Sequence, residues 1–202
     1  EEINIDEDTN AILKLLSGIP NDVRIRYKNN IWEVPYLEPV ALKKEAKIEG
    51  PILITGGTRG LGMAYAKYLV NHHKVKQLVL LGREQFPSKE EWNDYTKEDN
   101  ALAQKIKDIL YLESCGAEVK LINAPLIDKK ALEDSLLKIK QEWGVIKGLV
   151  HCAGLVDMET PAFIRKSIET ITKLQEPKVL GLHNLYEALK EHKIDFGILF
   201  SS

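Results

Sequence analysis

Short apolar runs alternate with amphipathic stretches from residue 51 to residue 202. Five runs are largely apolar, as strands buried on both faces of a parallel sheet are. Between them, apolar residues recur every three to four positions, the spacing of a helix with one buried face. The runs are PILIT (51–55), QLVLLG (77–82), EVKLINA (118–124), IKGLVHCAG (146–154) and FGILFSS (196–202). This order predicts an α/β fold, a Rossmann-type doubly wound parallel sheet that is incomplete at its C-terminus.

The stretches between these runs predict helices over residues 61–73, 101–116 and 129–143, and one long helical region over 167–192. Gly116 is a typical stop for the second helix, and Asp128 is placed to cap the N-terminus of the third. The polar insertion over residues 84–100 predicts a surface loop that carries a helical turn.

The first 48 residues follow a different pattern. Residues 11–16 predict a short helix, and the alternating segments 23–27 and 31–37 predict a β-hairpin. Two strands and a helical turn cannot bury enough apolar surface to be stable alone, so this segment must pack on something else. We therefore expect two parts, 1–48 with a charged linker at its end, and 49–202 as the sheet-containing part.

Composition narrows the possible functions. Hydrophobic residues make up 44% of the chain and the formal net charge is −2, which is typical of a globular protein and gives no reason to expect a nucleic-acid or membrane partner. No apolar stretch reaches the ~18 residues of a membrane span. Cys115 and Cys152 form no CxxC pair, which favours reduced thiols and a cytoplasmic location. The five histidines have no metal-ligand spacing, so no metal site is expected.

A glycine-rich loop follows the first apolar run and precedes a predicted helix. In this position glycines permit a sharp turn and a close approach of backbone to a pyrophosphate, while the helix N-terminus offers free N–H groups. A turn without ligand is the alternative, because short motifs match by chance. The loop reads TGGTRGLG and consists of Thr55, Gly56, Gly57, Thr58, Arg59, Gly60, Leu61 and Gly62.

Several motifs occur together in a fixed order: TGGTRGLG, LLGR, GAEV, HCAG, PKVLGLHNL and LFSS. The chain resembles, over nearly its whole length, the ketoreductase domain of a modular polyketide synthase, within the short-chain dehydrogenase/reductase superfamily. The segment TPAFIRK (160–166) resembles modules that lack a built-in acyltransferase, the trans-acyltransferase type. Residues 1–48 are similar to the end of the structural subdomain that precedes such a catalytic domain.

The resemblance implies NADPH as the cofactor. Arg83 stands where an NAD site would carry an acid, and its guanidinium could bind a 2′-phosphate bidentately, with Arg59 approaching from the other side. Pro125 stands where related domains have an acid facing the adenine, which leaves the backbone N–H of Leu126 for that contact. Beyond the loop, the expected cofactor-binding residues are Gly82, Arg83, Leu126, Ala153 and Gly154.

The resemblance also implies two catalytic residues. Lys178 matches the lysine that binds the nicotinamide ribose and lowers the pKa of a catalytic tyrosine, although by spacing alone it is an exposed helical lysine. Ser202 matches the serine that binds the substrate carbonyl. The tyrosine is expected about 13 residues after Ser202, so the 202 residues alone are expected to be inactive. They are also expected to be poorly stable, because the sheet would lack its final strands.

The implied function is reduction of the β-keto group of a polyketide intermediate by NADPH. The acyl chain of this intermediate would be linked through phosphopantetheine to an acyl carrier protein. The other expected partners are the neighbouring domains of the same multifunctional synthase, which would serve antibiotic biosynthesis. The alternatives are a catalytically inactive structural module and a free-standing short-chain reductase of small ketones. The triplet Val156-Asp157-Met158 keeps only part of an LDD-like marker, so the alcohol configuration stays open.

Overall fold

The computed structural model describes residues 26–28, 31–39, 48–155, 157 and 165–200. The chain divides into two units, Glu1–Glu45 and Ala46–Ser202, each of which is described by itself. In the first unit, strands β1 (Arg26–Lys28) and β2 (Ile31–Glu33) pair antiparallel, which confirms the predicted hairpin. The helix predicted over 11–16 lies outside the described residues. The assignment of 1–48 to a structural subdomain stays a prediction.

The second unit is built on a five-stranded sheet whose strands all run parallel. Their order is β5-β4-β3-β6-β7, so the chain moves outward from β3 in one direction and then crosses back to the other side. This is the Rossmann order, and it confirms the predicted fold class. The strands are β3 (Ile52–Thr55), β4 (Gln77–Gly82), β5 (Glu118–Asn123), β6 (Gly148–His151) and β7 (Phe196–Leu199).

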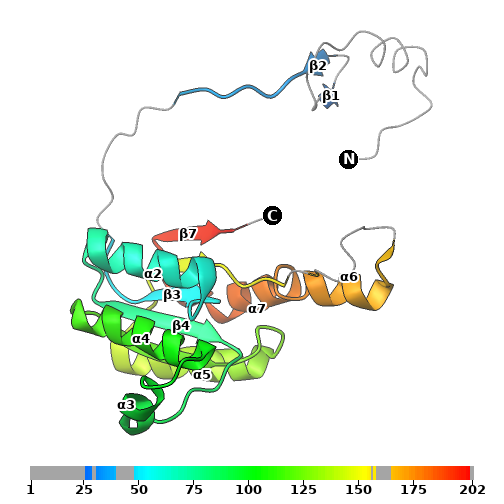
Figure 1. The fold of residues 1–202 in the computed structure, drawn as a ribbon. Coiled ribbons are helices and arrows are strands. Elements are labelled where there is room, and N and C mark those ends of the chain that lie inside the picture. The colour runs from blue at the N-terminus through cyan, green and yellow to red at the C-terminus, as the bar shows by residue number, and fades with distance from the viewer. Residues whose placement is uncertain (1–25, 29–30, 40–47, 156, 158–164, 201–202) are drawn as a thin grey trace. The chain divides into compact units, whose positions relative to one another are not determined.

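Helices cover both faces of this sheet (Figure 1). Helices α2 (Gly60–His73) and α4 (Ala101–Ser114) pack on the face that carries Ile52 and Ile54 of β3. Helices α5 (Lys129–Trp143) and α7 (Leu180–Ala188) pack on the other face, against Leu53. Successive residues of β3 therefore enter two different cores, and all four residues of the strand are buried. This explains why the strand is continuously apolar instead of alternating.

Polar residues and glycines end the helices where the sequence predicts. Asp128 caps α5, since its Oδ1 accepts a hydrogen bond from the Ala131 N–H at 3.0 Å. Gly116 follows α4 with a φ of 91°, a conformation that favours glycine.

The long helical region predicted over 167–192 is wrong as one helix. It is divided into α6 (Ile168–Gln175) and α7, with a turn over residues 176–179 between them. Pro177 lies in that turn, and a proline in a helix interior removes a backbone hydrogen bond and clashes with the preceding turn. Lys178 therefore lies in a turn between two helices and not on a helix.

The polar insertion after β4 carries the expected helical turn. It contains a 3₁₀ turn, η1 (Lys89–Glu91), followed by α3 (Trp92–Tyr95), at the bottom of Figure 1. The indole N–H of Trp92 donates to the Pro87 carbonyl at 3.0 Å within the insertion. The Trp92 side chain is buried in the core between the sheet and α2 and α4, and this packing fixes the insertion to the sheet-containing unit. None of the helices in the described ranges combines the length and apolarity that a membrane span requires.

Two adjacent leucines of α5 test how the sheet is covered. Leu136 is 1% exposed in the core, whereas Leu137 is 53% exposed. Leu136→Ala should lower the free energy of unfolding by about 2–5 kcal/mol, because it removes buried apolar contacts and leaves a cavity. Leu137→Ala, the control, should change it by less than about 1 kcal/mol. Urea unfolding measures both values, and equal losses would contradict the assigned orientation of α5.

Candidate cofactor site

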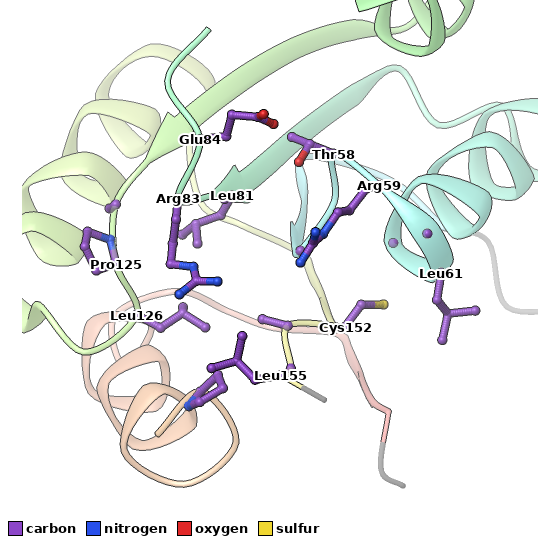
Figure 2. Close-up of a pocket in the computed structure, with 18 of the residues that line it drawn as sticks. Thr58, Arg59, Leu61, Leu81, Arg83, Glu84, Pro125, Leu126, Cys152 and Leu155 are labelled. Carbon is purple, nitrogen blue, oxygen red and sulfur yellow. The ribbon is translucent and has the colours of Figure 1, made fainter. Parts of the chain in front are cut away.

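A cavity of about 780 Å³ lies at the carboxyl ends of the strands. Its walls come from the loop after β3 and from the segments that follow β4, β5 and β6 (Figure 2). Strands β3 and β6 are neighbours in the sheet, but the strand that follows β3 in the chain lies on one side of this pair and the strand that follows β6 lies on the other side. Open α/β sheets bind their ligands at this kind of switch point, outside the carboxyl ends of the strands. The volume is in the range of small-molecule sites.

The glycine loop is packed against its own helix and against β6. A Cβ on Gly62 would lie 2.3 Å from the Gly56 carbonyl oxygen, so no other residue fits without displacing the backbone. Gly56 has a φ of 65°, and a Cβ there would lie 3.1 Å from the Ala153 nitrogen. Gly60 differs, since a Cβ there would meet nothing within 4 Å. Gly62 thus serves the packing of helix on loop, while Gly60 leaves space beside the cavity.

The N-terminus of α2 is open to an anion. The N-cap residue, Arg59, makes no side-chain capping hydrogen bond, and the first turn carries no acid. The first N–H groups of a helix have no partner within the helix, and the helix dipole places partial positive charge there. Gly60, Leu61 and Gly62, the first three helical residues, all line the cavity. A phosphate group fits this end of the helix.

Two arginines add full positive charge to the same cavity. Arg59 and Arg83 enter from opposite walls, and Figure 2 shows their side chains pointing toward one another. Within the described part of the chain, neither guanidinium has a hydrogen-bonded or ion-paired partner. Facing cations repel one another, and a dianion between them would remove this repulsion while offering oxygen acceptors to both guanidinium groups.

A buried hydrogen-bond network lies beneath the cavity floor. The Thr55 hydroxyl is 2.8 Å from Nδ1 of His151 and accepts a hydrogen bond from the Ala153 N–H at 3.2 Å. Burial lowers the pKa of His151, and the nearby Lys178 ammonium lowers it further against a raising effect of the Pro177 carbonyl. Nε2 of His151 is buried and has no hydrogen-bond partner among the residues described. The neutral imidazole therefore joins the ends of β3 and β6.

Lys178 lies next to the end of β6. A Cβ on Gly154 would be 3.4 Å from Cε of Lys178, so the lysine stem passes directly over this glycine. Glu176 and Pro177, the two residues before it, line the cavity. The structure thus brings Lys178, 24 residues along the chain from Gly154, to the edge of the cavity. Spacing alone predicts an exposed lysine on a helix, whereas Lys178 is half-buried and lies in a turn.

The segment after β5 is held in place by α7. The buried Asn184 side chain donates to the Leu126 carbonyl at 2.9 Å, and a Cβ on Gly181 would lie 2.8 Å from Cβ of Leu126. Pro125 and Leu126 both line the cavity. Sequence reasoning missed Asn184, although an amide in an otherwise apolar helix face was a signal for a buried hydrogen bond.

Most of the predicted cofactor-binding residues line the cavity: Gly56, Thr58, Arg59, Gly60, Leu61, Gly62, Gly82, Arg83, Leu126, Ala153 and Gly154. Thr55 lies below it in the hydrogen-bond network. Gly57 faces the sheet, because the Ile54 carbonyl and the Leu80 side chain occupy the space where its Cβ would be. Ser202 lies outside the described residues, as do Val156 and Met158, while Asp157 forms an ion pair with Lys166 at 2.5 Å.

Further cavity-lining residues had not been predicted: Leu81, Glu84, Lys105, Ala124, Ile127, Cys152 and Leu155. Burial raises the pKa of the Cys152 thiol, which keeps it a neutral wall of the cavity. In the part of the chain that the structure covers, no three His, Cys, Asp or Glu side chains are grouped to hold a metal ion.

Comparison with known proteins agrees with this geometry. Residues 50–202 match the family model described as the KR domain. The chain is 42% identical over 178 residues to polyketide synthase PksL of Bacillus subtilis (strain 168), which covers 88% of the chain and 4% of PksL. A ketoreductase domain from the bacillaene assembly line superposes with a TM-score of 0.71 at 31% identity, over 96% of this chain and 43% of that one. An N-terminal ketoreductase from the macrolactin assembly line gives 0.63 at 33% identity, over 81% and 30%.

The fold and the cavity define an α/β protein of the Rossmann type with a candidate ligand site at the switch point of its sheet. The chain belongs to the KR domain family, the ketoreductase domains of polyketide synthases. Members of this family are oxidoreductases that bind NAD(P)H and reduce β-keto groups. The chain spans less than half the length of the relatives named above.

The Thr55–His151 network predicts a pH dependence. Because the folded-state pKa of His151 is lowered, the unfolded state binds more protons below about pH 6.5, and stability falls as the pH decreases through this window. His151→Asn should reduce this slope by up to about 1.4 kcal/mol per pH unit. His192, whose pKa is also lowered by burial, remains in the variant, so part of the slope should persist.

Urea unfolding between pH 7.5 and 5.5 checks this expectation. His72→Asn, at the exposed C-terminal end of α2, makes the same substitution away from the cavity and serves as the control. Coincident pH profiles for wild type and His151→Asn would show that His151 does not contribute.

Proposed function

We propose that this chain is the nucleotide-binding part of a ketoreductase that uses NADPH to reduce the β-keto group of a polyketide intermediate. The intermediate would be an acyl chain linked through phosphopantetheine to an acyl carrier protein. Membership of the KR domain family and identity to PksL support this reading. The resemblance of TPAFIRK to modules without an acyltransferase supports the trans-acyltransferase type. A cytoplasmic location stays a prediction.

The observation that carries the choice of NADPH is the pair of facing guanidinium groups. Arg59 and Arg83 meet across the cavity without partners among the described residues, and a 2′-phosphate would be bound between them. The open N-terminus of α2 would receive the pyrophosphate. When bound, the reduced nicotinamide supplies a hydride for the ketone. Arg59, Arg83 and the N-terminus of α2 fit the phosphate groups of such a ligand. The backbone of Ala153 and Gly154 would form the wall below the nicotinamide.

Lys178 is proposed to complete the reaction chemistry. Its half-buried ammonium beside Gly154 would hydrogen-bond the nicotinamide ribose and favour the phenolate form of the tyrosine predicted beyond Ser202. A neighbouring cation lowers the pKa of an acid, which moves a phenol toward the range where it transfers protons efficiently. Ser202, which follows β7 in the sequence, would hold the substrate carbonyl oxygen.

Two other functions remain distinguishable by experiment. A structural module would keep the fold without turnover, and a free-standing reductase would act on small ketones. The decisive assay supplies NADPH and a β-ketoacyl thioester, with a simple ketone in parallel, to this chain extended through the predicted tyrosine. Reduction of the thioester alone supports the proposal, preference for the ketone supports the free-standing reductase, and no turnover supports the structural module.

Arg83→Ala tests the cofactor assignment. The loss of one bidentate phosphate contact should raise the Kd for NADPH about 10- to 100-fold, as expected for a hydrogen bond to a charged group, while the Kd for NADH changes little. Fluorescence titration measures both constants. Lys107→Ala, an exposed lysine of α4 outside the cavity, is the control. Equal losses for both nucleotides would refute the 2′-phosphate contact.

Lys178→Ala tests the catalytic assignment in the extended chain. The kcat should fall by about 10²- to 10⁴-fold with the fold intact, because the tyrosine loses the charge that lowers its pKa. Steady-state NADPH oxidation and circular dichroism measure the two properties. Lys173→Ala, on the exposed side of α6, should keep the wild-type rate. A near-normal rate for Lys178→Ala would make this residue a surface lysine without a catalytic role.

A further inference from the structure

An acidic residue lies in the cavity directly beside Arg83. Glu84 lines the cavity, and Figure 2 shows its side chain on the same side as Thr58. It follows the second strand of the sheet about 20 residues after the glycine loop. Glu84 is thus one residue beyond Arg83, at the strand end where an acid binds the ribose hydroxyls in sites that take a dinucleotide without a 2′-phosphate. Glu84 by itself therefore favours the wrong cofactor for a site with two arginines.

Lys105 of α4 pairs with this carboxylate. Its Nζ lies 2.5 Å from Oε2 of Glu84, and its side chain is 17% exposed, against 38% for Glu84. Lys105 also lines the cavity. Helix α4 is fixed at its N-terminus by Asn100, whose Oδ1 accepts a hydrogen bond from the Ala103 N–H at 2.8 Å. The lysine therefore approaches Glu84 from a rigid element.

The charges of the cavity follow from this pairing. Without Lys105, the Glu84 carboxylate would repel a 2′-phosphate and attract the guanidinium of Arg83, its neighbour in the chain. With Lys105, the carboxylate is neutralised and held, and both arginines keep their unpaired state. A half-buried pair is screened by salt less than an exposed one, so this neutralisation persists at ordinary ionic strength.

We propose that Lys105 determines cofactor specificity by neutralising Glu84, which makes the cavity accept a nucleotide with a 2′-phosphate. The proposal rests on the proposed nucleotide-binding function and adds to it a residue that acts through another one. Lys105 is thus a positioning residue, and its effect must show in the ratio of two ligand affinities and not in stability alone.

The test compares two ligands that differ only in the phosphate that the site is proposed to read. Wild type should bind 2′,5′-ADP more tightly than 5′-AMP in isothermal titration calorimetry. Lys105→Met should reduce this affinity ratio by about 10-fold, chiefly through weaker binding of 2′,5′-ADP. Lys105→Arg should retain the ratio. The double variant Glu84→Gln/Lys105→Met should restore it, because the charge that Lys105 balances is gone.

A second ion pair on α4 provides the matched control. Lys67 of α2 lies 2.8 Å from Asp108 and does not line the cavity. Lys67→Met removes the same charge from another ion pair that involves α4, and should leave the affinity ratio unchanged.

The outcomes separate the two proposals. Equal binding of both ligands by wild type would overturn the proposed NADPH site itself. A wild-type preference that survives Lys105→Met would overturn the role of Lys105 alone, and a double variant that stays weak would show direct phosphate binding by Lys105 instead of neutralisation. If Lys105→Met does not fold, Glu84→Gln decides, since freeing Lys105 should raise the ratio several-fold and an unchanged ratio would overturn the proposal.

Discussion

The first turn of α2 packs on the backbone of the loop that precedes it, and the rest of the site depends on this contact. Only a residue without a side chain fits at Gly62, 2.3 Å from the Gly56 carbonyl oxygen when a Cβ is added. The same loop is in backbone contact with Ala153 at the end of β6. The loop and the first turn of α2 thus meet the end of β6, which is distant in the sequence, in backbone contact. Their meeting places the N-terminus of α2 at the switch point of the sheet and brings Arg59 opposite Arg83.

Charge in the cavity is arranged around this framework. Partial positive charge at the start of α2 and two guanidinium groups surround the open space. The carboxylate of Glu84, just after β4, is paired with Lys105. Beneath the floor, burial keeps His151 neutral, so the network that joins Thr55 to β6 does not place another cation below the ligand. The cavity therefore favours an anion at one end and leaves the other end, beside Lys178, for the reacting groups.

The fold could be predicted from the sequence to a large extent because its strands are buried on both faces. Such strands give continuous apolar runs, and all five begin within two residues of their predicted starts, with β4 matching at both ends. The prediction was wrong where one residue outweighed a long periodic pattern, since Pro177 divides the helical region and places Lys178 in a turn. The glycine loop and the position of Arg83 after β4 were also readable, because both lie within a few residues of a strand end.

The sequence by itself determined the α/β order, the phosphate loop, the helix caps and the family to which the chain belongs. Each of these depends on residues that are neighbours in the chain or on the order of short motifs along it. Only the tertiary structure decided which polar groups meet: Glu84 with Lys105, Thr55 with His151, and Asn184 with the Leu126 carbonyl. These partners are 21, 96 and 58 residues apart. Thr55 and His151 meet because the strand order places β6 beside β3, and periodicity along a chain carries no information about such contacts between elements.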